Sequence, residues 1–252
     1  MDLAQPARLL SSINFNYKMN ELHILLVSAL SLGFIHTLLG PDHYLPFIVL
    51  SKARGWSQSK TLWITFISGV GHVGGSVFLG VAGVALGISV GKLESIEATR
   101  GSIVGWMLIL FGIIYTVYGI YKFFKHGGHH HFHFLMPKKV RKFHHLPMEE
   151  SSIPKENGTK LTPWILFLIF VFGPCEVLIP LLIYPAAQHN TFGIATVSIL
   201  FGIATITTML VMVLIGYKGI STVRFKRGEK FWHLIAGLII LMAGLGMTFM
   251  GW

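Results

Sequence analysis

Two Gly-Pro pairs interrupt two long apolar segments, and they constrain the fold more than any other feature of this sequence. The pair at residues 40–41 is followed by Asp42 and His43, and the pair at residues 173–174 is followed by Cys175 and Glu176. A helix cannot continue cleanly through a Gly-Pro pair, so each break releases backbone groups within an apolar segment. Matching breaks in two halves of a chain are typical of membrane transporters that are built from a repeat.

The composition indicates a polytopic, all-α membrane protein. Of the 252 residues, 53% are hydrophobic and only 12% are charged, and the mean hydropathy is +0.66. Soluble domains carry roughly 25% charged residues. The sole cysteine, Cys175, excludes a disulfide within the chain. The first 20 residues lack the apolar core of a signal peptide, so we expect the first span to be retained.

The apolar segments predict six transmembrane helices, because about 20 apolar residues cross a bilayer as a helix. Spans one and four contain the Gly-Pro breaks, and the stretch from Pro46 to Ser51 can instead be a separate half-helix. Three spans in each half predict a 3+3 inverted repeat. The expected organisation is a first repeat at residues 1–125, a loop at 126–160 and a second repeat at 161–252. The spans are expected at residues 22–51, 61–90, 102–124, 161–187, 191–217 and 231–252.

The distribution of Lys and Arg predicts the orientation. Of the 20 basic residues, 16 fall in the loops after spans one, three and five. The positive-inside rule places these loops in the cytosol and both termini outside the cell membrane. Topology thus explains the net charge of +10, and we expect no nucleic-acid partner. The lipid bilayer is the expected environment, and the glycine-rich spans are compatible with a homo-oligomer.

Several metal-binding side chains are expected at membrane depth, where polar groups are costly and usually functional. Imidazole, carboxylate and thiolate ligands suit nickel, cobalt, zinc or iron(II) better than calcium or magnesium. Structural roles remain open, since Asp can cap a half-helix, His can bond a backbone carbonyl and Cys can be an inert buried thiol. The candidate ligands are His36, Asp42, His43, His72, Cys175 and Glu176.

The loop after span three predicts a second metal site. Seven histidines fall within residues 126–145, and a His-rich tract is typical of metal binding. A solvated basic tether is the alternative interpretation. The expected ligands are His129, His130, His131 and His133.

His36, Asp42 and His43 resemble the His-Asp-His signature of nickel/cobalt transporters. Five residues separate His36 from Asp42 here, whereas the family form has four. The Gly-His-Val-Gly-Gly segment around His72 and the His-rich loop are also similar to the NicO and urease-accessory UreH-like branch of the LysE-like superfamily. That superfamily also includes thiol-electron carriers of cytochrome c biogenesis and sulfite exporters, so the similarity leaves the substrate open.

From the ligands and the resemblance we expect a proton-coupled transporter of a divalent transition metal, nickel or cobalt first. We do not expect an enzyme, and the sequence has no Walker-type nucleotide-binding loop. One alternative is a thiol-based electron carrier, but disulfide chemistry needs a second thiol that this sequence lacks. Others are an anion exporter for sulfite or a sulfonate, and a metal sensor that uses the His-rich loop alone.

Overall fold

The structure, a computed structural model, describes residues 4–125, 161–175, 177–188, 190–222 and 231–250, which form helices and no strand. The predicted all-α fold is therefore confirmed. Glu176 and the His-rich loop lie outside the described residues. The elements are α1 (Ala4–Leu39), the 3-10 helix η1 (Pro41–His43), α2 (Leu45–Ala53), α3 (Gln58–Ala85), α4 (Val90–Lys125), α5 (Leu161–Phe172), α6 (Leu178–Ala187), α7 (Thr191–Thr222) and α8 (Trp232–Met250).

Both predicted breaks are present. The first apolar segment divides into α1, η1 and α2, so residues 46–51 do belong to a separate short helix. The second divides into α5 and α6 on either side of residues 173–177. Proline at the second position of α2 is well placed, because the first turn of a helix needs no hydrogen bond from that nitrogen.

The predicted boundaries of the third span were wrong. We expected it to begin at residue 102, but α4 begins at Val90 and includes Lys92 and Arg100. These residues therefore belong to a helix and not to a loop. Charged side chains lower the local hydropathy, which is why the sequence alone placed a connection there.

The exposed surface is that of an integral membrane protein. Large apolar side chains such as Phe78 and Leu39 are more than 70% exposed, as expected for helices that face lipid tails. Five helices among the described residues are long and apolar enough to cross a membrane, whereas six were predicted. The missing crossing is the fourth, because α5 has only 12 residues and α6 only 10.

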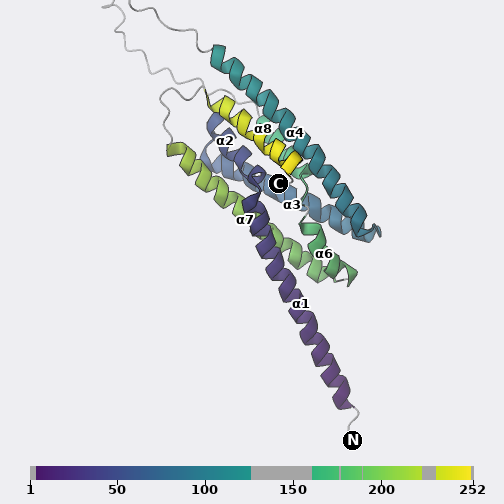
Figure 1. The fold of residues 1–252 in the computed structure, drawn as a ribbon. Helices are drawn as coiled ribbons and strands as arrows, with labels where there is room; N and C mark the ends of the chain where they lie inside the picture. Colours follow the sequence, from purple (N-terminus) through teal and green to yellow (C-terminus); the bar gives the residue numbers. More distant parts are fainter. Residues whose placement is uncertain (1–3, 126–160, 176, 189, 223–230, 251–252) are drawn as a thin grey trace, which may run out of the picture.

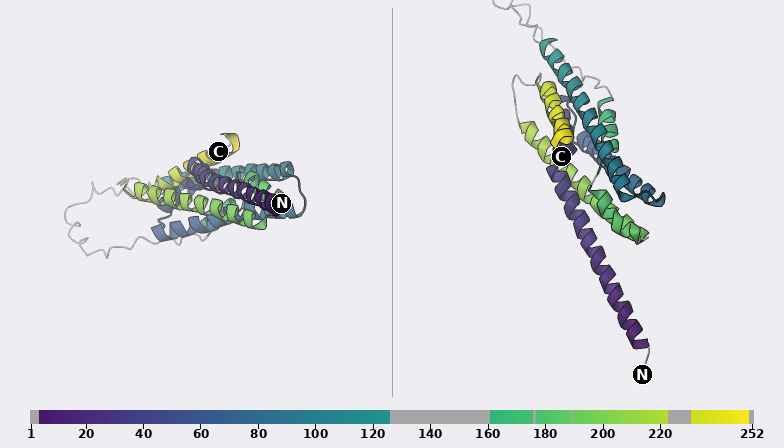
Figure 2. Two further views of the ribbon diagram at one scale, coloured as in Figure 1. Left: turned by 90° about the horizontal axis from the view of Figure 1, so that it is seen from below. Right: turned by 45° about the vertical axis from the view of Figure 1, so that its right-hand side comes forward.

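The helices pack in pairs along the molecule. α4 lies beside α8, and α1 lies beside α7, with part of α1 projecting beyond the other helices (Figures 1 and 2). Glycine permits the close α4–α8 contact: a Cβ atom added at Gly112 would lie 2.5 Å from the backbone nitrogen of Leu241. Small residues at such interfaces let two backbones approach closely.

Two groups of buried apolar side chains surround the second break. One is centred on α2, α4, α5 and α8 and includes Phe47 and Phe170, whose ring centroids are 4.7 Å apart. The other is centred on α6 and α7 and includes Cys175 and Phe201. The break between α5 and α6 is therefore fixed on both sides by packed side chains.

Candidate functional site: a buried thiol beside three imidazoles

The first break and α3 bring three imidazole rings together. His36 is in the last turn of α1, His43 is in η1, and His72 is in the middle of α3. The ring centroid of His43 lies 4.9 Å from that of His36 and 5.1 Å from that of His72. His43 and His72 are buried, with 3% and 4% of their surface exposed. The rings form an imidazole cluster of His36, His43 and His72.

Hydrogen bonds orient two of these rings. The Nδ1 atom of His43 lies 3.2 Å from Oδ1 of Asp42 and 3.1 Å from the carbonyl oxygen of Gly40. The Nδ1 atom of His72 lies 3.3 Å from the carbonyl oxygen of Phe170. These oxygens are acceptors when the carboxyl group is ionised, so each Nδ1 carries the proton and donates it. In the neutral form of each ring, Nε2 then presents a lone pair.

All three Nε2 atoms of the imidazole cluster are buried and have no hydrogen-bond partner within the described part of the chain. Buried polar atoms are rarely left unsatisfied. Three of them in one cluster indicate that the site is built to accept a proton, a water molecule or an ion.

Cys175 adds a sulfur atom to this cluster. Its side chain has no exposed surface, and its Sγ lies within 4.8 Å of a ring nitrogen of both His36 and His72. The backbone N–H of Cys175 donates to Oγ of Ser76 over 3.1 Å, which ties the second break to α3. The glycine before Pro174 also matters, since a Cβ atom at Gly173 would lie 3.0 Å from Nδ1 of His72.

Asp42 does not cap a helix. The residue before α2 is Tyr44, and no side chain caps that helix or η1. The capping interpretation of Asp42 was therefore wrong, because its carboxylate accepts a hydrogen bond from the adjacent His43. This contact fixes the direction of one ring in the imidazole cluster.

Arg100 is a site residue that the sequence did not reveal. Its Nη2 atom lies 3.3 Å from the carbonyl oxygens of Val171 and Gly173, at the end of α5. Its Nη1 atom lies 2.5 Å from Oε1 of Glu97, which is fully buried. The Glu97–Arg100 spacing of three residues within a helix was the available signal.

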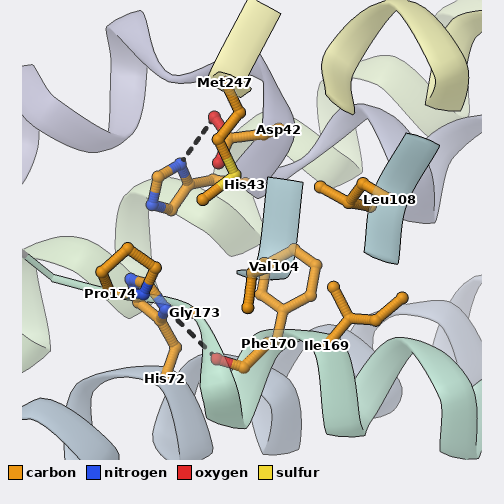
Figure 3. A pocket seen from close by; sticks show the side chains of 10 residues that line it. All are labelled: Asp42, His43, His72, Val104, Leu108, Ile169, Phe170, Gly173, Pro174 and Met247. Atoms are coloured by element: carbon orange, nitrogen blue, oxygen red, sulfur yellow. Dashed lines mark hydrogen bonds and ion pairs between the residues drawn. The ribbon is translucent and has the colours of Figure 1, made fainter. Parts of the chain in front are cut away.

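A small cavity lies between the two breaks. In Figure 3, Asp42 and His43 from the first break lie across the cavity from His72 and from Gly173–Pro174 of the second. The cavity volume is about 20 Å³, and one water molecule requires roughly 10–15 Å³. This cavity, which Cys175 and His36 do not line, therefore has room for a water molecule or a single ion beside His43 and His72, and a larger molecule can enter only if the helices separate.

The structure describes some of the predicted site residues and not others. The structure brings His36, His72 and Cys175 together, and it places His43 with Asp42 beside them. The position of Glu176 is not described. His129, His130, His131 and His133 also lie outside the described residues.

The fold and the site define an all-helical integral membrane protein with a thiol and imidazoles at two helix breaks. Residues 46–246 match the family described as cytochrome c biogenesis protein transmembrane region. This match covers about four-fifths of the chain, and the protein belongs to that family. No curated protein and no solved structure matches the chain.

The family match corrects two predictions. The resemblance to nickel/cobalt transporters was wrong as a family assignment, and metal transport was wrong as the main function. The match favours the alternative of thiol-based electron transfer, which we had disfavoured because the sequence has one cysteine. The matched segment contains Cys175 and His72, and it begins after His36, Asp42 and His43, which carried the His-Asp-His part of the transporter resemblance.

Proposed function

We propose that the protein takes part in thiol-based electron transfer at a membrane, with Cys175 as the reacting group. The observation that carries this proposal is the position of the cysteine: its Sγ lies within 4.8 Å of nitrogens of His36 and His72, inside a segment that matches the cytochrome c biogenesis family. A thiolate is the reactive form of cysteine, and a neighbouring imidazole can accept the thiol proton.

Because the chain has one cysteine, both partners of the exchange are other molecules: an acceptor disulfide and a donor that supplies two thiols, either as one dithiol or as two molecules of a monothiol. The Cys175 thiolate attacks the acceptor disulfide, so one S–S bond breaks, a mixed disulfide forms and one acceptor thiolate leaves. The first donor thiolate then attacks the sulfur of Cys175 and releases the second acceptor thiolate. The second donor thiolate attacks the donor sulfur, which restores Cys175 and completes a two-electron transfer. The imidazole cluster holds the proton of Cys175 between these steps.

Formation of a mixed disulfide tests the first step. Purified protein is incubated with glutathione disulfide, and the adduct is measured by intact-protein mass spectrometry. We expect an adduct on the wild type and none on Cys175→Ser, and we expect slower formation in His72→Ala. An adduct that forms only after unfolding in detergent would contradict the proposal.

Transfer across the bilayer is tested in proteoliposomes loaded with reduced glutathione, with an impermeant aromatic disulfide outside. We expect release of the aromatic thiol outside to be faster with the wild type than with Cys175→Ser or protein-free vesicles. The matched control is Ser68→Ala, which changes a buried hydroxyl of α3 whose oxygen has no hydrogen-bond partner among the described residues. Equal rates for wild type and Cys175→Ser would reject electron transfer through this residue.

A second candidate is a resident transition-metal ion bound by His36, His72 and Cys175. Two observations support it. The three ligand atoms all lie within 4.8 Å of one another, and the Nε2 atoms of both histidines are buried without a hydrogen-bond partner among the described residues. Two nitrogens and one sulfur suit zinc, iron(II), cobalt or nickel. Asp42 would act by orienting His43 beside the ion. Metal analysis of the purified protein tests this candidate, and equal metal content in wild type and a His36→Ala, His72→Ala variant would reject it.

We also propose six membrane crossings arranged as a 3+3 inverted repeat, with the α5–α6 pair as the fourth crossing. The packing supports this, because α1 packs on α7 as α5 packs on α3, while α4 packs on α8 and α3 on α7. Exchanging the two halves replaces α1 by α5, α3 by α7 and α4 by α8. This exchange converts the α1–α7 contact into the α5–α3 contact, and it leaves the α4–α8 and α3–α7 contacts unchanged. Cysteine labelling from each side of the membrane, at positions before α5 and after α6, tests the crossing.

A further inference from the structure

At one end of the bundle, positively charged side chains lie over aromatic rings. The last residues of α2 and α4 meet the beginning of α8 there (Figure 1). Arg54 follows α2, Lys122 is in the last turn of α4, and His233 is in the first turn of α8. We call Arg54, Tyr115, Tyr118, Lys122 and His233 the basic–aromatic cluster.

The guanidinium of Arg54 is held by two aromatic rings and keeps donors available. Its central carbon lies 5.4 Å from the ring centroid of Tyr115 and 5.8 Å from that of Tyr118. A cation–π contact uses the charge and leaves the N–H groups without an acceptor. The Nε atom of Arg54 is buried, and it has no hydrogen-bond partner in the described part of the chain. This donor calls for an acceptor from outside the described residues.

A chain of hydrogen bonds brings a second cation to the same place. Nζ of Lys122 lies 3.0 Å from Nε2 of His233, and Nδ1 of His233 lies 3.0 Å from Oη of Tyr115. A lysine ammonium group can only donate, so His233 accepts at Nε2 and donates from Nδ1 to Tyr115. His233 is therefore neutral in this arrangement. These three hydrogen-bonded side chains carry the positive charge of Lys122 and no negative charge.

The two ion pairs between described residues, Asp42–His43 and Glu97–Arg100, lie at the helix breaks and not at this end. A third cation lies nearby, since Nζ of Lys52 is 5.5 Å from the ring centroid of Trp232. Lysine, arginine, tyrosine and tryptophan at the end of a membrane helix mark the headgroup level of the bilayer.

We propose that the basic–aromatic cluster binds the phosphate of an anionic phospholipid headgroup. Arg54 supplies the N–H donors, because guanidinium groups match phosphate oxygens in geometry. Lys122 and Lys52 supply further charge, while the rings of Tyr115 and Tyr118 hold Arg54 in place. A headgroup fits better than free phosphate, since the site lies at the end of the helices, where the lipid supplies its phosphate at high local concentration.

The test is lipid retention by the full-length protein. The protein is purified in detergent, equilibrated with phosphatidylglycerol or phosphatidylcholine, and measured by native mass spectrometry. We expect bound phosphatidylglycerol on the wild type and about fivefold less on Arg54→Gln, which is the effect of one basic residue near a lipid surface. Arg54→Lys keeps the positive charge but lacks the planar guanidinium with its several N–H donors, and we expect an intermediate loss of bound phosphatidylglycerol.

Lys60→Gln is the matched control, because Nζ of Lys60 lies over the ring of Trp56 at 5.5 Å, outside the cluster. It removes the same charge, and we expect it to retain phosphatidylglycerol like the wild type. Thermal unfolding in phosphatidylcholine reports whether each variant is folded. Equal retention by folded Arg54→Gln and wild type would overturn the proposal. Full displacement of the lipid by millimolar inorganic phosphate would also overturn it, in favour of a site for free anions.

Discussion

Nη2 of Arg100 lies 3.3 Å from the carbonyl oxygen of Gly173, the residue that precedes the proline of the second break. The same nitrogen lies equally close to the carbonyl oxygen of Val171. The break leaves the last carbonyl groups of α5 without partners in their own helix. Arg100 is 71 and 73 residues away in the sequence, and it donates to one of these groups, the carbonyl of Val171, and to the carbonyl of Gly173 in the break. It therefore holds the segment that carries Cys175.

We predict that Arg100→Met destabilises the protein by about 3 kcal/mol, because the variant removes the ion-pair partner of a buried carboxylate. The carboxylate of Glu97 is buried and would lose its contact with Nη1. The measurement is thermal or denaturant unfolding in detergent. Lys92→Met on the same helix is the control, because Lys92 is exposed, and we expect little change. Equal stability of the two variants would show that the contact with the break contributes nothing.

The sequence predicted the breaks but not the residue that stabilises the second of them. Gly-Pro pairs act locally, through the missing N–H group and the fixed proline backbone, so the ends of α1 and α5 could be located from the sequence. The roles of Arg100 and Glu97 depend on a contact between α4 and α5. Their charges made the first turns of α4 resemble a loop, because hydropathy does not register that two charges neutralise each other.

The candidate site was partly predictable for a similar reason. His36, His72 and Cys175 stand out because polar groups are rare in apolar segments, and the structure places them together. Their chemistry could not be predicted, since imidazole and thiol groups serve metal binding and thiol exchange equally well. The capping role predicted for Asp42 was wrong: no side chain caps η1 or α2, and the carboxylate of Asp42 accepts from the adjacent His43 instead.

Gly112 and Gly74 offer a matched pair of substitutions in the helix packing. A Cβ atom at Gly112 would lie 2.5 Å from the backbone nitrogen of Leu241, whereas one at Gly74 would have no neighbour within 4 Å. We predict that Gly112→Ala destabilises by about 1–3 kcal/mol, because the backbones of α4 and α8 must move apart. Gly74→Ala should be neutral or stabilising, since alanine favours a helix by about 1 kcal/mol over glycine. The measurement is the unfolding midpoint of each variant in the same detergent. A lower midpoint for Gly74→Ala than for Gly112→Ala would show that the α4–α8 contact does not depend on a glycine at position 112.

Gly173→Ala tests whether the position of His72 controls the reactivity of Cys175. The new Cβ atom would lie 3.0 Å from Nδ1 of His72 and 3.1 Å from the carbonyl oxygen of Phe170. Both atoms belong to the hydrogen bond that orients the ring. We predict that mixed-disulfide formation slows by about tenfold, because small displacements of a catalytic group have large effects on rate. The control is Gly74→Ala, also near His72 in α3. An unchanged rate in folded Gly173→Ala would separate His72 from the chemistry of Cys175.

Ser76→Ala tests the hydrogen bond that fixes the backbone at Cys175. Oγ of Ser76 accepts from the N–H group of Cys175 over 3.1 Å, and both residues are fully buried. Removing the hydroxyl group leaves that N–H group without its acceptor in an apolar site, and we predict a loss of about 1–3 kcal/mol. Ser68 is equally buried in α3, but its Oγ has no hydrogen-bond partner among the described residues. Ser68→Ala removes no satisfied hydrogen bond, so it should be neutral or slightly stabilising. Denaturant unfolding of the two variants compares them directly, and a similar loss in both would mean that the hydroxyl of Ser76 contributes only packing.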